Sequence, residues 1–355
     1  MIAPRLFFPR PPRFRAAAPD CSLLPPGEGL GTREVLARGA MYVALLAGMA
    51  ATLHAQDYPV KPVRFVVGFA AGGASDTLAR IVAQNLTESW GQNVIVDNRT
   101  GAGGTIGADM VVKAQPDGYT IFVGDFGPNV LAGSLYAKLP YDPFAGFAHV
   151  TQMVSFPLVL LVPAASSFAS VRDLIDQAKA KQGGLRYSSS GVGTSPHMFI
   201  ELINLMANVT TTPIHYKGGA PALIGLVAGE GDFSMVSVST ALAQLAAGKI
   251  RAIGVTSAKP VSRLSNVPPI GNTLAGYDAV SFYGLHAPAQ MPPQFVAKLQ
   301  QEVAKVMRRP EVKERFDGLG MDVVPANTPL EFTAFMRRQI DMWTKVAKAA
   351  NVRAE

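Results

Sequence analysis

The sequence contains a single cysteine, Cys21, close to its amino terminus. An internal disulfide is therefore excluded, and the fold must depend on its apolar core. The 355-residue chain is long enough to bury such a core, for which about 300 residues suffice. Charged residues make up only 16% of the sequence. Because lysine and arginine form no cluster interleaved with aromatic residues, we expect no nucleic-acid binding.

Recognisable catalytic and metal-binding patterns are lacking too. There is no Gly-x-Ser-x-Gly motif, and the histidines at 149, 197, 215 and 286 do not have the spacing of metal ligands. Ser195 and His197 are neighbours without an evident orienting acid, so they do not form a triad. We expect no enzyme, no metal and no cofactor. A secreted α/β hydrolase that uses Ser195 is the alternative.

The first 55 residues predict a secretory leader. Residues 1–32 are rich in proline and arginine, and Arg33 and Arg38 precede an uncharged run at 39–53 with a small residue at Ala55. This order is typical of a signal peptide, and the run is short for a membrane span. We expect cleavage after Ala55 and a periplasmic location, with no lipid on Cys21. Removal of six arginines and three acidic residues lowers the net charge from +7 to about +4.

Strand-like apolar runs alternate with helical patterns in the remainder, which predicts an α/β fold with mainly parallel sheets. Two long apolar stretches, at 154–163 and 280–288, are predicted to cross between two lobes. Lobe 1 would then comprise residues 57–157 and 281–355, and lobe 2 residues 158–280. Strands are expected at 63–67, 94–96, 120–123, 158–162, 185–188, 233–236 and 252–255, and helices at 77–90, 107–114, 171–180, 198–207, 220–228, 293–307 and 330–348.

Two strand–glycine–helix junctions, one in each predicted lobe, are the most informative feature. The first spans residues 63–76 and the second residues 185–197. Each ends in small residues, so unpaired backbone N–H groups lie at the start of a helix, where they and the helix dipole attract anions. Two such loops that face each other across a cleft can hold one small carboxylate from both sides.

The chain resembles the solute receptors of tripartite tricarboxylate transporters, the Bug or TctC family. The resemblance covers nearly all of residues 58–350. It rests on short motifs that are weak alone and specific in this order: Gly68-Phe69-Ala70-Ala71-Gly72-Gly73 with Asp76, Asp97-Asn98-Arg99-Thr100-Gly101-Ala102-Gly103-Gly104, Pro116-Asp117-Gly118-Tyr119, Leu139-Pro140-Tyr141-Asp142-Pro143, Ser189-Ser190-Gly191-Val192-Gly193-Thr194-Ser195-Pro196-His197, Tyr216-Lys217-Gly218-Gly219, Ala247-Gly248-Lys249-Ile250 and Tyr283-Gly284.

The resemblance implies a two-lobed, periplasmic-binding-protein-like fold of the Venus-flytrap type (type II). It implies a receptor that closes on a small carboxylate, whether a dicarboxylate, a tricarboxylate or an aromatic acid, and delivers it to a membrane permease of the tripartite type. A monomer is expected. A receptor that feeds a membrane signalling protein instead of a permease is a further alternative.

The first loop is the main candidate for ligand contact. The loop comprises Phe69, Ala70, Ala71, Gly72 and Gly73, and its backbone is expected to contact the ligand. Asp76 has two candidate roles. Because a carboxylate would repel a neighbouring anion, Asp76 either holds the loop or contacts an amine or hydroxyl group of the ligand.

The second loop adds neutral hydroxyl donors, which suit reversible binding. Its candidates are Ser189, Ser190, Gly193, Thr194, Ser195 and His197, and the resemblance points most strongly to Ser190, Gly193 and Thr194. His197 lies in the first helical turn, where the dipole disfavours protonation. It either bonds the loop backbone as a neutral ring or touches the ligand.

Two more loops follow strands at the edge where α/β sheets bind ligands. The first contributes Phe126 and Gly127, with Phe126 and Phe69 expected as apolar walls. The second contributes Ser237 or Ser239, where many relatives carry Asp or Asn. The missing acid at that position argues against an amino-acid ligand and for a plain or aromatic carboxylate.

Overall fold

The strand β1 (Val63–Val67) shows how apolar runs build the core, because Phe65, Val66 and Val67 on both of its faces are fully buried. The computed structural model describes residues 58–324 and 327–354, so the predicted leader at 1–55 lies outside the described residues. β1 pairs in parallel with β2 (Val94–Asn98) on one side and β3 (Thr120–Gly124) on the other. This three-stranded unit positions the first glycine-rich loop.

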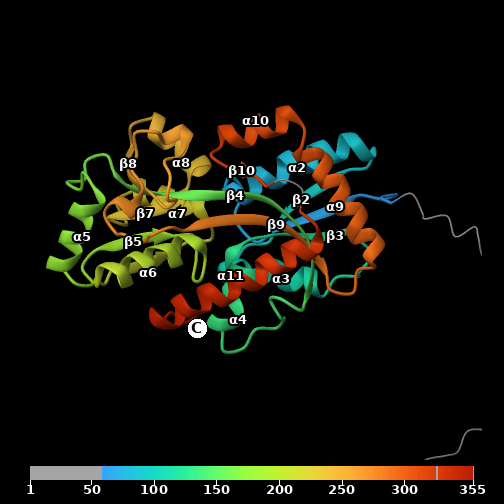
Figure 1. The fold of residues 1–355 in the computed structure, drawn as a ribbon, viewed down its shortest axis with the longest axis horizontal. Helices are drawn as coiled ribbons and strands as arrows, with labels where there is room; N and C mark the ends of the chain where they lie inside the picture. The colour runs from blue at the N-terminus through green and yellow to red at the C-terminus, as the bar shows by residue number, and fades with distance from the viewer. Residues whose placement is uncertain (1–57, 325–326, 355) are drawn as a thin grey trace, which may run out of the picture. The chain divides into compact units, whose positions relative to one another are not determined.

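Helices pack around this three-stranded unit (Figure 1). Gly68 and Gly104 approach so closely that a Cβ on Gly68 would lie 2.8 Å from the Cα of Gly104. The helical elements are α2 (Ala74–Trp90), η1 (Ala102–Gly104), α3 (Thr105–Val112), the π-helical turn η2 (Gly127–Leu131), α4 (Ala132–Leu135), α9 (Pro293–Met307), α10 (Pro310–Gly318) and α11 (Pro329–Ala349).

A second group of parallel strands positions the other glycine-rich loop. β5 (Arg186–Ser189) pairs in parallel with β6 (Thr212–His215) and with β7 (Phe233–Ser237). The remaining elements of this group are α5 (Val171–Ala180), α6 (Ser195–Ala207), α7 (Gly219–Val227), α8 (Val238–Ala246) and β8 (Ile250–Val255).

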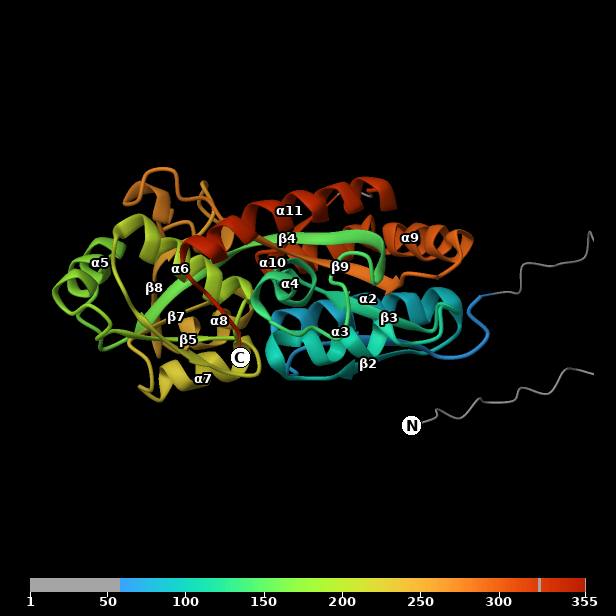
Figure 2. The same ribbon diagram turned by 90° about the horizontal axis from the view of Figure 1, so that it is seen from below.

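Two long antiparallel strands, β4 (Phe147–Pro163) and β9 (Val280–Pro288), connect the two groups (Figures 1 and 2). β4 pairs with β9 up to Pro157, and from Leu158 onward it pairs with β7 and β8. The short β10 (Asp322–Val323) also pairs with β4. β9 has the bounds of the predicted apolar stretch 280–288, whereas β4 contains the predicted stretch 154–163 and begins seven residues before it.

The α/β prediction is confirmed, with parallel pairing inside each strand group and antiparallel pairing at β4 and β9. The lobe boundaries at 157/158 and 280/281 stay a prediction, since residues Tyr58–Glu355 form one compact unit. Within the described ranges, no helix combines the length and the apolar character that crossing a membrane requires.

The starts predicted for the two helices that follow the glycine-rich loops were each wrong by three residues. α2 begins at Ala74 instead of residue 77, because Gly73 is the N-cap and Asp76 lies inside the first turn. α6 begins at Ser195 instead of residue 198, with Thr194 as its N-cap. Pro196 fits the first turn of α6, where a backbone N–H would have no partner in the helix.

Candidate functional site

The two glycine-rich loops meet at a small cavity that is partly open to solvent. Residues from both strand groups and from the connecting strands line it. The first group supplies Phe69, Gly73, Ala74, Ser75 and Asp125; the connecting strands supply Phe156, Leu158 and Tyr283; the second group supplies Ser190, Ser195, Pro196, Gly219, Val236, Ser237 and Thr240. The cavity is therefore enclosed by segments far apart in the sequence.

The starts of α2 and α6 both contribute to this lining. In α2 the first backbone hydrogen bond within the helix runs from the Thr77 N–H to the Gly73 carbonyl at 3.0 Å, so the amides of the preceding turn have no acceptor in the helix. In α6 the corresponding bond runs from Met198 to Thr194 at 3.0 Å. Bare amides and the positive end of a helix dipole favour an anion at both places.

Two further helices, α7 and α8, also begin at the cavity. Gly219 is the first residue of α7, and Gly218 precedes it as N-cap. Ser237 is the N-cap of α8, where its hydroxyl accepts a hydrogen bond from the Thr240 N–H at 3.3 Å. The sequence predicted a strand before Ser237 and no helix after it. Four helix starts, instead of the two expected, therefore surround one cavity.

The lining of the cavity combines polar groups with an apolar part. The rings of Phe156 on β4 and Tyr283 on β9 stack with centroids 4.7 Å apart. Phe69, Leu158 and Val236 complete the apolar part of the lining. Such walls exclude water and strengthen the polar contacts made at the helix starts.

Asp125 is the carboxyl of the lining, and sequence reasoning missed it. It directly follows β3 and is 7% exposed, and its Oδ1 accepts a hydrogen bond from the Gly127 N–H at 3.2 Å. Burial raises the pKa of Asp125 to about 8, against the opposing effect of that N–H. The signal for Asp125 was its position directly after a strand, at the edge where ligands bind, but only its neighbours Phe126 and Gly127 were predicted as site residues.

Phe126 does not form a cavity wall. Its ring is fully buried in edge-to-face contacts with Phe199 on α6 and Trp343 on α11, at centroid distances of 5.6 and 4.9 Å. The backbone turns into η2 at this point, and the ring is directed into the core. Gly127 is likewise outside the lining, and its N–H is the donor to Asp125.

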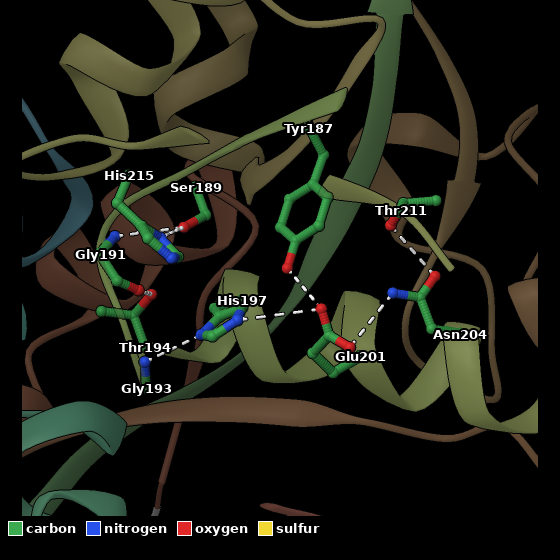
Figure 3. Close-up of polar contacts among 10 residues, drawn as sticks. All are labelled: Tyr187, Ser189, Gly191, Gly193, Thr194, His197, Glu201, Asn204, Thr211 and His215. Carbon is green, nitrogen blue, oxygen red and sulfur yellow. Dashed lines mark hydrogen bonds and ion pairs between the residues drawn. The ribbon is translucent and has the colours of Figure 1, made fainter. Parts of the chain in front are cut away.

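Hydrogen bonds within the second loop hold its shape (Figure 3). The Thr194 hydroxyl donates to the Gly191 carbonyl at 2.7 Å and accepts from the Ser190 hydroxyl at 3.1 Å. The Gly193 N–H donates to Nδ1 of His197 at 3.0 Å. Ser189 bonds Nδ1 of His215 at 2.8 Å. Of these side chains only Ser190 reaches the cavity lining.

His197 is a neutral support of the loop backbone. Its Nδ1 accepts a hydrogen bond, so the proton is on Nε2, which lies 3.9 Å from Oε1 of Glu201. Burial, and then the neighbouring His215, lowers the pKa of His197 to about 3. Glu201 in turn accepts from the Tyr187 hydroxyl at 2.6 Å and from Asn204 at 3.2 Å, as Figure 3 shows.

Asp76 holds the first loop. Its Oδ2 accepts from the Gly72 N–H at 3.0 Å, and its carboxylate pairs with Arg80 at 2.9 Å. Burial alone would raise the pKa of Asp76, but hydrogen bonds from Arg80 and Gly72 outweigh it and the net pKa is lowered. Asn98 adds a bond to the Phe69 carbonyl at 2.9 Å.

Each loop also bonds a segment outside itself. In the first loop the Ala70 N–H donates to the carbonyl of Lys217, just before α7, at 3.1 Å, and in the second the Ser195 hydroxyl accepts from the Ser281 hydroxyl on β9 at 2.9 Å. The partner of Ser195 is therefore another hydroxyl, and Nδ1 of His197 is occupied by Gly193. This arrangement does not resemble an activated nucleophile.

Five of the predicted site residues line the cavity: Phe69, Gly73, Ser190, Ser195 and Ser237. The others belong to the same loops but lie outside the lining: Ala70, Ala71, Gly72, Asp76, Phe126, Gly127, Ser189, Gly193, Thr194, His197 and Ser239. Ser239 is hydrogen-bonded to Ser237 at 3.0 Å. Five of the ten lining residues that were not predicted come from the connecting strands and from α7 and α8, and the other five directly follow β3 or lie on α2, α6 and β7.

The fold and the cavity define a class of protein: a two-lobed α/β binding protein whose helix starts converge on one small site. Its fold is similar to that of the solved structure described as "R. palustris Rpa4515 with adipate", with a TM-score of 0.80 and 32% identity over 83% of this chain and 99% of that one. It is also similar to the "periplasmic binding protein BugD", with a TM-score of 0.79 and 30% identity over 84% of this chain and 100% of that one.

The sequence comparisons agree with the structural ones. A relative from Pseudomonas sp. (strain P51), described as "UPF0065 protein in tcbD-tcbE intergenic region", is 35% identical over 319 residues, which is 89% of this chain and 94% of the relative. The pattern of the family described as "Tripartite tricarboxylate transporter family receptor" matches residues 78–352. The chain belongs to this family. It is a solute-binding receptor, and the predicted family and fold class are confirmed.

Proposed function

We propose that this receptor binds a small carboxylate in the cavity between its two loops and delivers it to a membrane permease of the tripartite type in the periplasm. The observation that carries the proposal is the convergence of four helix starts, those of α2, α6, α7 and α8, on one cavity. Bare amides and helix dipoles neutralise an anion without a fixed charge, which suits a carrier that must release its ligand.

The similar structure of Rpa4515 is described with adipate, a dicarboxylate, which supports a carboxylate ligand here. The apolar walls from Phe69, Phe156 and Tyr283 suit the hydrocarbon part of such a ligand. Lobe 1 (57–157 and 281–355) and lobe 2 (158–280) would close around it by a hinge motion in β4 and β9. The change of pairing partners between Pro157 and Leu158 on β4 supports a boundary there.

A thermal-shift screen tests the ligand class. Adipate, malate and benzoate are compared with glucose and a short DNA duplex. A ligand at a hundredfold excess over its dissociation constant stabilises the folded state by about 2.7 kcal/mol, so at least one carboxylate should raise the melting temperature clearly. A shift with glucose or DNA alone would refute the proposal. Incubation with carboxylic esters, followed by chromatography, tests the hydrolase alternative, and turnover would support it.

A further inference from the structure

The cavity contains one carboxyl group and no side-chain cation to pair with it. Asp125 is 7% exposed, and its Oδ1 is engaged by the Gly127 N–H at 3.2 Å. No Lys, Arg or His side chain belongs to the described cavity lining. An ionised Asp125 would therefore be a buried charge without a cationic partner, which is costly for a carboxylate so little exposed to water.

The ionisable groups on the surrounding elements do not supply the missing positive charge. The guanidinium of Arg80 is paired with Asp76 on the same helix at 2.9 Å. Helices α7 and α8 contain no ionisable residue. Other described ionisable groups nearby supply no buried cation. On α6 and β9 they are His197, Glu201, Tyr283 and His286, and burial lowers the pKa of both histidines. The hydroxyl of Tyr141 donates to the Pro128 carbonyl, and Lys217, just before α7, is exposed and outside the lining.

A bound carboxylate would bring a second negative charge to the described lining, which contains no side-chain cation. Two carboxyl groups that share one site cannot both ionise cheaply, so the second retains a proton. Burial already raises the pKa of Asp125 to about 8, so this carboxyl is neutral at pH 7 before any ligand arrives. A neutral carboxylic acid is a hydrogen-bond donor, and its bond to a carboxylate is of the strong, charge-assisted kind.

We propose that Asp125 is a specificity-determining residue that recognises the ligand as a neutral acid, donating its proton in a hydrogen bond to a ligand carboxylate oxygen. The proposal rests on the carboxylate function proposed above. It selects carboxylates without a neighbouring ammonium group, because an ammonium would require the ionised form of Asp125. It also couples binding to one proton: affinity is constant from about pH 6, where the ligand is ionised, to about pH 8, and falls about tenfold per pH unit well above that.

The test is calorimetry of the whole protein with adipate, malate and benzoate at pH 7 and pH 9, each in two buffers of different ionisation enthalpy. We expect affinity about tenfold weaker at pH 9, with uptake of nearly one proton at pH 9 and nearly none at pH 7. Between pH 7 and pH 9 the other ionisable side chains near the site do not titrate, because burial lowers the pKa of His197 and of His215 and raises that of Tyr283.

Three variants complete the test. Asp125→Asn keeps the shape and a donor but cannot titrate, so we expect binding that is retained and equally strong at pH 7 and 9. Asp125→Leu removes the donor and should weaken binding at least tenfold. Asp117→Asn is the control: this carboxylate is 43% exposed and pairs with Lys61, and the pH profile of wild type should persist. Melting temperatures verify that each variant is folded.

Two results would overturn the assignment. The first is wild-type affinity that stays level or rises between pH 7 and 9. The second is a folded Asp125→Asn variant that no longer binds, since that would show that the ionised carboxylate is needed. In either case carboxylate binding itself, and with it the proposed function, would stand. If none of the three carboxylates binds wild type at either pH, the proposed function fails and this assignment fails with it.

Discussion

Thr194 shows how single side chains support the site without lining it. Its hydroxyl donates to the Gly191 carbonyl and accepts from Ser190, and it is 1% exposed. The same division holds for Asp76 and His197, which bond the backbones of the two loops. At this scale the polar side chains fix the loops, and the loops present their backbone amides to the cavity.

Replacing Thr194 by valine keeps the volume but removes both hydrogen bonds. We expect a loss of about 1–3 kcal/mol in the free energy of unfolding, because each of the two buried bonds contributes about 0.5–1.5 kcal/mol. Carboxylate affinity should fall by a similar amount as the loop loosens. Urea denaturation and calorimetry measure the two effects. Thr194→Ser restores the hydroxyl and should recover both; equal defects in Val and Ser variants would contradict the role of the hydroxyl.

At the scale of elements, the start of α2 is the part of the site that the sequence describes most directly. Gly73 is its N-cap and lines the cavity. A Cβ placed on Gly73 would have the Ala70 carbonyl oxygen as its nearest neighbour, at 3.5 Å, which is ordinary contact. Its backbone φ of −80° suits any residue. The glycine is therefore not required by the fold, and its small size keeps the helix start open.

Gly73→Leu should accordingly fold but fill the cavity at the helix start. We expect far-ultraviolet circular dichroism close to that of wild type and a loss of carboxylate affinity of at least tenfold, measured by calorimetry. Gly73→Ala is the matched control, since it adds only the Cβ for which there is room, and its affinity should be affected much less. Wild-type affinity in the leucine variant would place the ligand away from the start of α2.

On the scale of the whole molecule, buried neutral histidines make the fold sensitive to acid. His149 and His286 on the paired strands β4 and β9 share a hydrogen bond between their Nδ1 atoms at 2.8 Å. Among the described residues neither Nε2 has a partner. Burial lowers the pKa of His149 to about 4, and burial together with His149 lowers the pKa of His286.

In the unfolded chain histidine takes up a proton at a pKa of about 6.5, so below this pH protons favour the unfolded state. Stability should be complete above about pH 6.5 and fall toward pH 4, by at most about 1.4 kcal/mol per pH unit for each such histidine. Urea denaturation at pH 7.5, 6 and 4.5 measures this slope. His149→Gln cannot take up the proton and should reduce the slope; an unchanged slope would exclude His149 as a source.

The sequence by itself determined the elements with strong local patterns. Val63–Val67, Val171–Ala180, Val280–Pro288 and Pro293–Met307 were predicted with their exact bounds, because apolar period and flanking prolines or glycines identify such segments locally. It also identified both glycine-rich loops. The helices α8 and α10 and the strand β6 were not predicted; polar or short segments such as these carry little periodic signal.

Only the tertiary structure decided which residues of each loop reach the cavity. Asp125 and Phe126 are adjacent, yet the carboxyl lines the cavity and the ring packs against Trp343. Tyr283 and Phe156 meet because β4 and β9 are paired over a sequence separation of more than a hundred residues. Local sequence fixes backbone preference, whereas the direction of a side chain depends on which distant elements leave room for it, since a close-packed interior offers each ring a single place.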